Sequence, residues 1–112
     1  MKTSDAIQSL AALSQETRLA IYRLLVQQGP EGLAVGTIAE QTNVSGATLS
    51  FHLKELANAD LVTTRQQGRF VFYAANFAQM NKLLAYLTEN CCQGQGCVTQ
   101  CAPIRQPSRK RA

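Results

Sequence analysis

Residues 44–56 read VSGATLSFHLKEL, and the spacing of their apolar side chains predicts an amphipathic helix. Ser45 is a good N-cap, and we expect the helix to reach about Ala59. Its apolar face carries Leu49, Leu53 and Leu56. His52 falls at the edge of that face and is interpreted as a structural residue, hydrogen-bonded beside the core. The opposite face is small and polar apart from one ring: Ala47, Ser50, Phe51 and Lys54.

The segments around this helix predict a winged helix-turn-helix. A short helix over about 37–41 precedes it, separated by a break at 42–44. Residues 61–65 and 69–73 follow it, and both are rich in β-branched and aromatic side chains. Residues 66–68, Gln-Gln-Gly, supply the turn of a β-hairpin wing. In this arrangement the second helix can enter a DNA major groove, about 12 Å wide, while the hairpin flanks it.

The expected contacts with double-stranded DNA lie on the outward face of the second helix and on the hairpin. Hydroxyl side chains can donate to or accept from several bases, and the helix N-terminus offers backbone N–H groups to a phosphate. Arg65 and Arg69, expected at the hairpin tip, suit phosphate or minor-groove contacts. An alternative places Phe51 in a packing role. The predicted DNA-binding residues are Ser45, Ala47, Thr48, Ser50, Phe51, Lys54, Arg65 and Arg69.

Three further helices complete a mainly α (α+β) fold of about five helices. The first covers about residues 5–13, and Ser14 is expected to cap the second, which Gln28-Gly29-Pro30 ends. The last helix is expected to start at Asn76 and to end near Asn90. It carries an apolar stripe of Phe77, Met80, Leu83, Leu84 and Leu87. The first and last helices thus carry more apolar surface than one small core needs.

Composition limits the class of protein. The chain has 112 residues, 46% of them hydrophobic, which favours one domain. No apolar run approaches the roughly 20 residues that span a bilayer, and residues 1–5 lack signal-peptide character, so we expect a cytoplasmic protein without a membrane partner. The net charge is +4, but four of the 11 basic residues lie in the last eight positions, which leaves as many basic as acidic residues elsewhere. DNA binding therefore rests on arrangement, not on charge.

Three motifs in order resemble the ArsR/SmtB family of metal-responsive repressors. ALSQETRL at 12–19 with IYRLL at 21–25 resembles the start of that family, and residues 44–56, with their Ser-x-His-Leu core, resemble its recognition helix. Leu61-Val62 and residues 68–73 resemble its wing. The resemblance spans about residues 6–92. It implies a homodimer held by the first and last helices, which occupies a palindromic operator and leaves it when an inducer binds.

Four cysteines follow the last helix: Cys91, Cys92, Cys97 and Cys101. In a reducing cytoplasm they favour ligands or reactive groups over disulfides. Glycines 94 and 96 let the chain curl so that Cys97 can join the adjacent pair. Three thiolates favour a soft, three-coordinate ion, and As(III) or Sb(III) fits best. The cluster resembles the C-terminal arsenite site of one branch of arsenic repressors, with Cys101 as the alternative third ligand.

Several alternatives stay open for these cysteines. All four thiolates could hold Zn(II) or Cd(II) in a tetrahedral site, and a pair such as Cys92 and Cys97 could sense oxidants or persulfides. An organic arsenical would need only two of the thiols. The cysteines could also belong to an inert tail that binds no ligand. A thiol enzyme is disfavoured, since Cys-x-x-Cys and nucleotide-loop motifs are missing from the sequence. A metal-buffering protein is a third possible class of function. We expect no organic cofactor.

We therefore divide the chain into three parts. Residues 1–92 form the DNA-binding and dimerisation domain, 91–101 the inducer-binding segment, and 102–112 a basic tail expected to be disordered. The predicted function is an arsenical-resistance repressor that binds As(III) through Cys91, Cys92 and Cys97.

Overall fold

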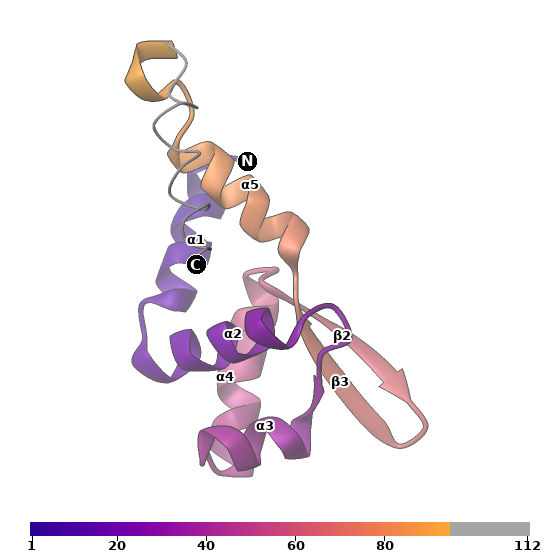
Figure 1. The fold of residues 1–112 in the computed structure, drawn as a ribbon. Helices are drawn as coiled ribbons and strands as arrows, with labels where there is room; N and C mark the ends of the chain where they lie inside the picture. The colour runs from indigo at the N-terminus through magenta and orange to yellow at the C-terminus, as the bar shows by residue number, and fades with distance from the viewer. Residues whose placement is uncertain (95–112) are drawn as a thin grey trace, which may run out of the picture.

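The computed structural model describes residues 1–94; Cys97, Cys101 and the tail at 102–112 lie outside the described residues. Five α-helices, three strands and a 3-10 turn follow one another along this part of the chain (Figure 1). Their bounds are α1 Thr3–Leu13, α2 Glu16–Gln28, β1 Leu33–Ala34, α3 Val35–Thr42, α4 Gly46–Asn58, β2 Val62–Gln67, β3 Phe70–Ala75, α5 Phe77–Leu87 and η1 Cys91–Gly94. The predicted winged helix-turn-helix is confirmed.

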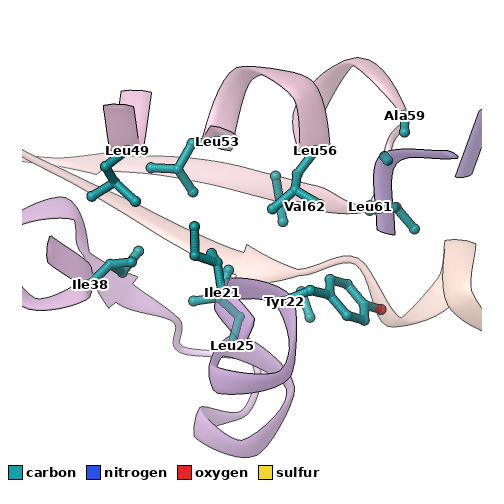
Figure 2. Close-up of a cluster of buried hydrophobic side chains, with 12 residues drawn as sticks. Ile21, Tyr22, Leu25, Ile38, Leu49, Leu53, Leu56, Ala59, Leu61 and Val62 are labelled. Carbon is teal, nitrogen blue, oxygen red and sulfur yellow. The ribbon is translucent and has the colours of Figure 1, made fainter. Parts of the chain in front are cut away.

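The core lies between α2, α3, α4 and the sheet. Figure 2 shows the three leucines of α4 in a row, facing Ile38 of α3 and Ile21 of α2. Leu49 and Leu56 are fully buried and Leu53 is 2% exposed, as the helical spacing predicts. The reason is the hydrophobic effect, which favours removing these side chains from water by about 25 cal/mol per Å² of apolar area. Burying this face leaves the other side of α4 to solvent.

The hairpin is longer than predicted, and its loop starts two residues later than predicted and ends one residue later. β2 and β3 pair antiparallel from Val62 opposite Ala75 to Gln67 opposite Phe70, so the loop consists of Gly68 and Arg69 alone. Gly68 has φ +64, a value that a residue without Cβ adopts readily. Residues 66 and 67, expected in the turn, therefore belong to the strand, because a two-residue loop with glycine first is sufficient to reverse the chain.

β1 is an element that local sequence patterns did not predict. Its two residues pair with β3, giving the sheet order β1-β3-β2. Gly32, just before it, is buried with φ +76, and a Cβ there would lie 2.3 Å from the Tyr73 carbonyl oxygen. This close backbone approach requires glycine and holds the α2–β1 connection against the wing.

Several helix ends differ from prediction: α1 and α3 each begin two residues earlier than expected, and the ends of α2 and α5 differ as well. Ser14 does not cap α2; its hydroxyl donates to the Ala11 carbonyl at 2.8 Å, and Gln15 caps the helix by accepting from the Arg18 N–H at 2.9 Å. The predicted cap is therefore wrong by one residue. Ser14 lies just before the N-cap position of α2, where its hydroxyl bonds to the last turn of α1 instead. Asn76, the predicted first residue of α5, is its N-cap, and the helix runs from Phe77 to Leu87 instead of to Asn90.

α1 and α5 pack together at the end of the molecule away from α3 and the wing tip (Figure 1). Their outer surfaces expose large apolar side chains: Ile7, Leu10, Phe77, Leu84 and Leu87. Leu83, assigned to the same predicted stripe, is instead 2% exposed. Among residues 1–94, no helix has the length and apolar character needed to cross a membrane.

Candidate nucleic-acid interface

The outward face of α4 presents the side chains predicted to read DNA. Ala47, Thr48, Ser50 and Lys54 are exposed, and Phe51 leaves 55% of its surface in contact with solvent. These residues lie together on one side of one helix, with the buried leucines behind them. The placement agrees with the prediction, whereas contact with DNA remains a prediction.

The turn between α3 and α4 leaves the N-terminus of α4 open. Asn43 ends α3 in the left-handed conformation, with φ 58, which asparagine tolerates better than most residues. Ser45 occupies the predicted N-cap position and is exposed, but its side chain makes no cap hydrogen bond. Its hydroxyl and the first N–H groups of the helix can therefore face a phosphate.

His52 lies behind this face as a structural residue, as predicted. It is 7% exposed, and its Nδ1 lies 3.2 Å from a terminal guanidinium nitrogen of Arg18. Nε of Arg18 in turn donates to the Ala12 carbonyl at 2.7 Å. Arg18 has no role that could be predicted from local patterns, because its partner His52 is 34 positions away and helical periodicity carries no signal of such a pair.

The two arginines of the hairpin occupy different environments. Arg69 lies in the loop itself and is exposed. Arg65, also expected at the tip, lies within β2 opposite Phe72, and its guanidinium sits 4.5 Å from the centre of that ring. It also donates to the Glu31 carbonyl at 2.8 Å and to the Gln67 side chain. The prediction that Arg65 lies at the hairpin tip is therefore wrong. Arg65 connects the wing to the α2–β1 connection through its hydrogen bond to Glu31.

The cysteine segment begins beyond α5, at the opposite end of the molecule from the wing tip (Figure 1). Cys91 is half-buried and its N–H donates to the Thr88 carbonyl at 3.0 Å; Cys92 is exposed, with φ 54. Both open the turn η1. Within residues 1–94, no three His, Cys, Asp or Glu side chains are grouped so that they could hold a metal ion. Cys97 and Cys101 lie outside the described residues, so the three-sulfur site remains a prediction.

Comparison with known proteins supports a regulator of transcription. A family model for a helix-turn-helix domain matches residues 13–65. An uncharacterised helix-turn-helix-type transcriptional regulator of Bacillus subtilis, YceK, is 43% identical over 72 residues, which cover 62% of this chain and 71% of the relative. The arsenical resistance operon repressor of the same organism is 35% identical over 85 residues, covering 76% and 77% of the two chains.

The fold also matches a solved structure. The homodimeric winged helix-turn-helix DNA-binding domain of a possible ArsR-family transcriptional regulator from Mycobacterium bovis has a TM-score of 0.62 and 26% identity. The match covers 83% of this chain and 86% of that one. These relatives are described as regulators of transcription, which agrees with the class of protein predicted from sequence.

Proposed function

The chain belongs to the ArsR/SmtB family of transcriptional regulators, and we propose that it is an operator-binding repressor released by a thiophilic ion. The observation that carries this proposal is the exposed face of α4. Its small and hydroxylated residues, a protruding Phe51 and Lys54 stand clear of the core. As a DNA-binding regulator, the protein would act in the cytoplasm.

The proposed operator contacts divide by chemistry. Lys54 and Arg69 are exposed cations suited to phosphates, and Ser45 with the α4 N-terminus can bind a further phosphate. Ala47, Thr48 and Ser50 are small enough to approach base edges, and the Phe51 ring can contact a thymine methyl group. Arg65 would reach DNA with whatever donors its contacts to Glu31 and Gln67 leave available.

The proposed functional unit is a homodimer joined through α1 and α5. Leu84 and Leu87 of α5 are each 52% exposed, and Ile7 of α1 is 61% exposed. These two helices lie at the end of the molecule opposite the wing tip (Figure 1). Burying them against a second copy would remove apolar surface from water. A two-fold axis there would direct two α4 helices at successive major grooves of a palindromic operator. The homodimeric state of the Mycobacterium bovis relative supports a dimer.

The proposed inducer is As(III) or Sb(III), held by Cys91, Cys92 and Cys97. The described residues supply two adjacent cysteines at the start of η1, of which Cys92 is exposed and Cys91 half-buried. Thiolate ligands suit soft ions, and the similarity to an arsenical resistance repressor supports a metalloid. The third sulfur would come from Cys97, or from Cys101. An organic arsenical could use the first two alone.

A second candidate is a Zn(II) or Cd(II) response through all four cysteines. It is favoured by the fourth thiol, Cys101, which a three-coordinate ion does not need. Sensing of oxidants by a cysteine pair such as Cys92 and Cys97 would need no metal at all.

One titration tests the proposal and separates these inducers. The reduced protein is bound to fluorescent DNA from upstream of its own operon, and arsenite, antimonite, Cd(II) or Zn(II) is added while anisotropy reports release. We expect operator binding well above that of a scrambled duplex, and release by arsenite or antimonite at near-stoichiometric amounts. Equal binding to both duplexes would refute the repressor; release by Cd(II) or Zn(II) alone would refute the metalloid.

A further inference from the structure

Arg18 joins three helices through three hydrogen bonds. Its backbone N–H is held by the side chain of Gln15, the N-cap of its own helix α2, at 2.9 Å. Its Nε donates to the carbonyl of Ala12, in the last turn of α1, at 2.7 Å. A terminal nitrogen reaches Nδ1 of His52, in the middle of α4, at 3.2 Å. One half-buried guanidinium therefore connects the end of α1 with the centre of α4.

The contact with His52 has a defined direction. A guanidinium can only donate, so Nδ1 of His52 is the acceptor and carries no proton. In the neutral ring the proton then lies on Nε2. The charged group that contacts this ring is Arg18 of α2. Glu55, one turn further along α4, lines the same hollow between α1 and α4 as Arg18 does. A side chain at position 52 must therefore offer an acceptor at the place of Nδ1.

His52 in turn contacts the aromatic ring on the outward face of α4. The rings of Phe51 and His52 meet edge to face, with centroids 5.4 Å apart and an angle of 63° between their planes. Such pairs have a preferred geometry, so the buried histidine limits the orientations of its exposed neighbour. The contacts thus run without a gap from the Ala12 carbonyl through Arg18 and His52 to Phe51.

We propose that Arg18 is a positioning residue for DNA recognition: it orients His52 and Phe51 and so ties the reading face of α4 to the end of α1. The proposal rests on the proposed function, in which α4 reads the operator and α1 contributes to the dimer. A movement of α1 would reach the reading face through this guanidinium. Losing it leaves the leucine face of α4 in the core, so the helix stays in place while Phe51 loses its preferred orientation.

The test compares Arg18→Gln with Arg23→Gln. Arg23 lies on the same helix and is exposed, so its replacement removes the same charge from α2 without touching His52. Each variant is titrated with operator duplex and with a scrambled duplex. We expect Arg18→Gln to bind operator up to about tenfold more weakly, because the Phe51 side chain is then ordered only when the protein binds DNA. Its binding to the scrambled duplex should equal that of Arg23→Gln.

Two further variants test the histidine. His52→Asn keeps an acceptor near the position of Nδ1 and should retain most operator affinity, whereas His52→Leu fills the space without an acceptor and should behave like Arg18→Gln. The orientation of Phe51 is read without DNA from protein labelled with 4-fluorophenylalanine. The resonance assigned by Phe51→Leu should shift or broaden in Arg18→Gln and stay unchanged in Arg23→Gln. If Arg18→Gln fails to fold, the two His52 variants give the same comparison.

The positioning role would be overturned if Arg18→Gln and Arg23→Gln bound operator with equal affinity. It would also be overturned if His52→Asn and His52→Leu did so. An unchanged Phe51 resonance in Arg18→Gln would overturn it as well. These failures differ from failure of the proposed function, in which the wild-type chain itself binds operator and scrambled duplexes alike. In that case the fluorine resonance still decides whether Arg18 orients Phe51.

Discussion

Leu83 and Leu84 are consecutive residues of α5, yet 2% of Leu83 is exposed and 52% of Leu84. Leu83 packs inside its own chain, whereas Leu84 and Leu87 face outward with Phe77. The apolar stripe of this helix thus has two uses: one side completes the subunit, and the other is available to a second copy. The two leucines give opposite expectations on substitution.

We expect Leu84→Glu and Leu87→Glu to dissociate the homodimer while the subunit stays folded. Each charge would have to be buried without a partner in the proposed interface, raising the dimer dissociation constant about tenfold or more. Leu83→Ala should instead lower the free energy of unfolding by about 2–4 kcal/mol. Sedimentation equilibrium and denaturant titration measure the two effects.

Ala78→Glu is the matched control, since Ala78 is exposed on α5 away from that stripe. It should leave both measurements unchanged. A Leu84→Glu chain that sediments as the wild type does would place the interface elsewhere.

Lys54 and Ser50 should differ in what their loss does to DNA binding. Lys54→Ala should weaken binding to operator and scrambled duplexes alike and reduce the salt dependence by about one counterion, as loss of one phosphate contact does. Ser50→Ala should change the preference among operator bases. Lys82→Ala, an exposed lysine on α5, is the control and should change neither. Affinities measured across a salt series decide; if Ser50→Ala and Lys54→Ala both resemble the control, α4 does not face DNA as proposed.

The cysteine variants should separate operator binding from release. Cys91→Ser and Cys92→Ser should bind operator as the wild type does and no longer respond to arsenite, because the coupling of ion to DNA, typically about 1–3 kcal/mol, passes through these sulfurs. Cys97→Ser should behave in the same way, and Cys101→Ser should respond nearly as the wild type does. Arsenite titration of the DNA-bound variants is the measurement.

The comparison of the last two variants identifies the third ligand. An unresponsive Cys101→Ser with a responsive Cys97→Ser would move the ligand to Cys101. Loss of response in both would establish the four-sulfur site.

Tyr22 should make the fold sensitive to alkaline pH. Burial raises the pKa of its phenol above the usual value near 10, because the charged form is poorly solvated in the core. The unfolded chain therefore ionises first as pH rises, and stability present below about pH 10 is lost above it. Tyr22→Phe should remove this part of the loss. It should cost little at pH 8, because the hydroxyl has no hydrogen-bond partner among residues 1–94.

Denaturant titrations at pH 8 and above pH 10 test this expectation. Tyr86→Phe is the control: it removes a hydroxyl that bonds to Thr3, so it should cost stability at pH 8 and keep the alkaline loss due to Tyr22. An alkaline loss as large in Tyr22→Phe as in the wild type would assign it to other groups.

Much of the fold could be predicted from local patterns. The leucine spacing of residues 49–56 predicts which side of α4 is buried, and the apolar spacing from residue 77 onward predicts to within one residue where α5 begins. The outward position of Ser50 and Lys54 follows from the same period of 3.6 residues, because one buried face defines its opposite. For the cysteines, the sequence predicts the type of ligand, while Cys97 and Cys101 lie beyond the described residues.

The sequence by itself thus determined the order of the five helices and the hairpin, the buried face of α4 and the residues exposed beside it. Only the tertiary structure decided that Arg18 bonds to His52, that Arg65 bonds to the Glu31 carbonyl, and that β1 joins the sheet. Both arginine contacts join residues 34 positions apart. The periodicity of a sequence shows which side of a helix or strand is apolar. It does not show whether that side packs against its own chain or faces outward, because this depends on the packing of elements that are distant in sequence. For this reason Leu83 and Leu84 belong to one predicted apolar stripe, yet only Leu83 is buried in the subunit.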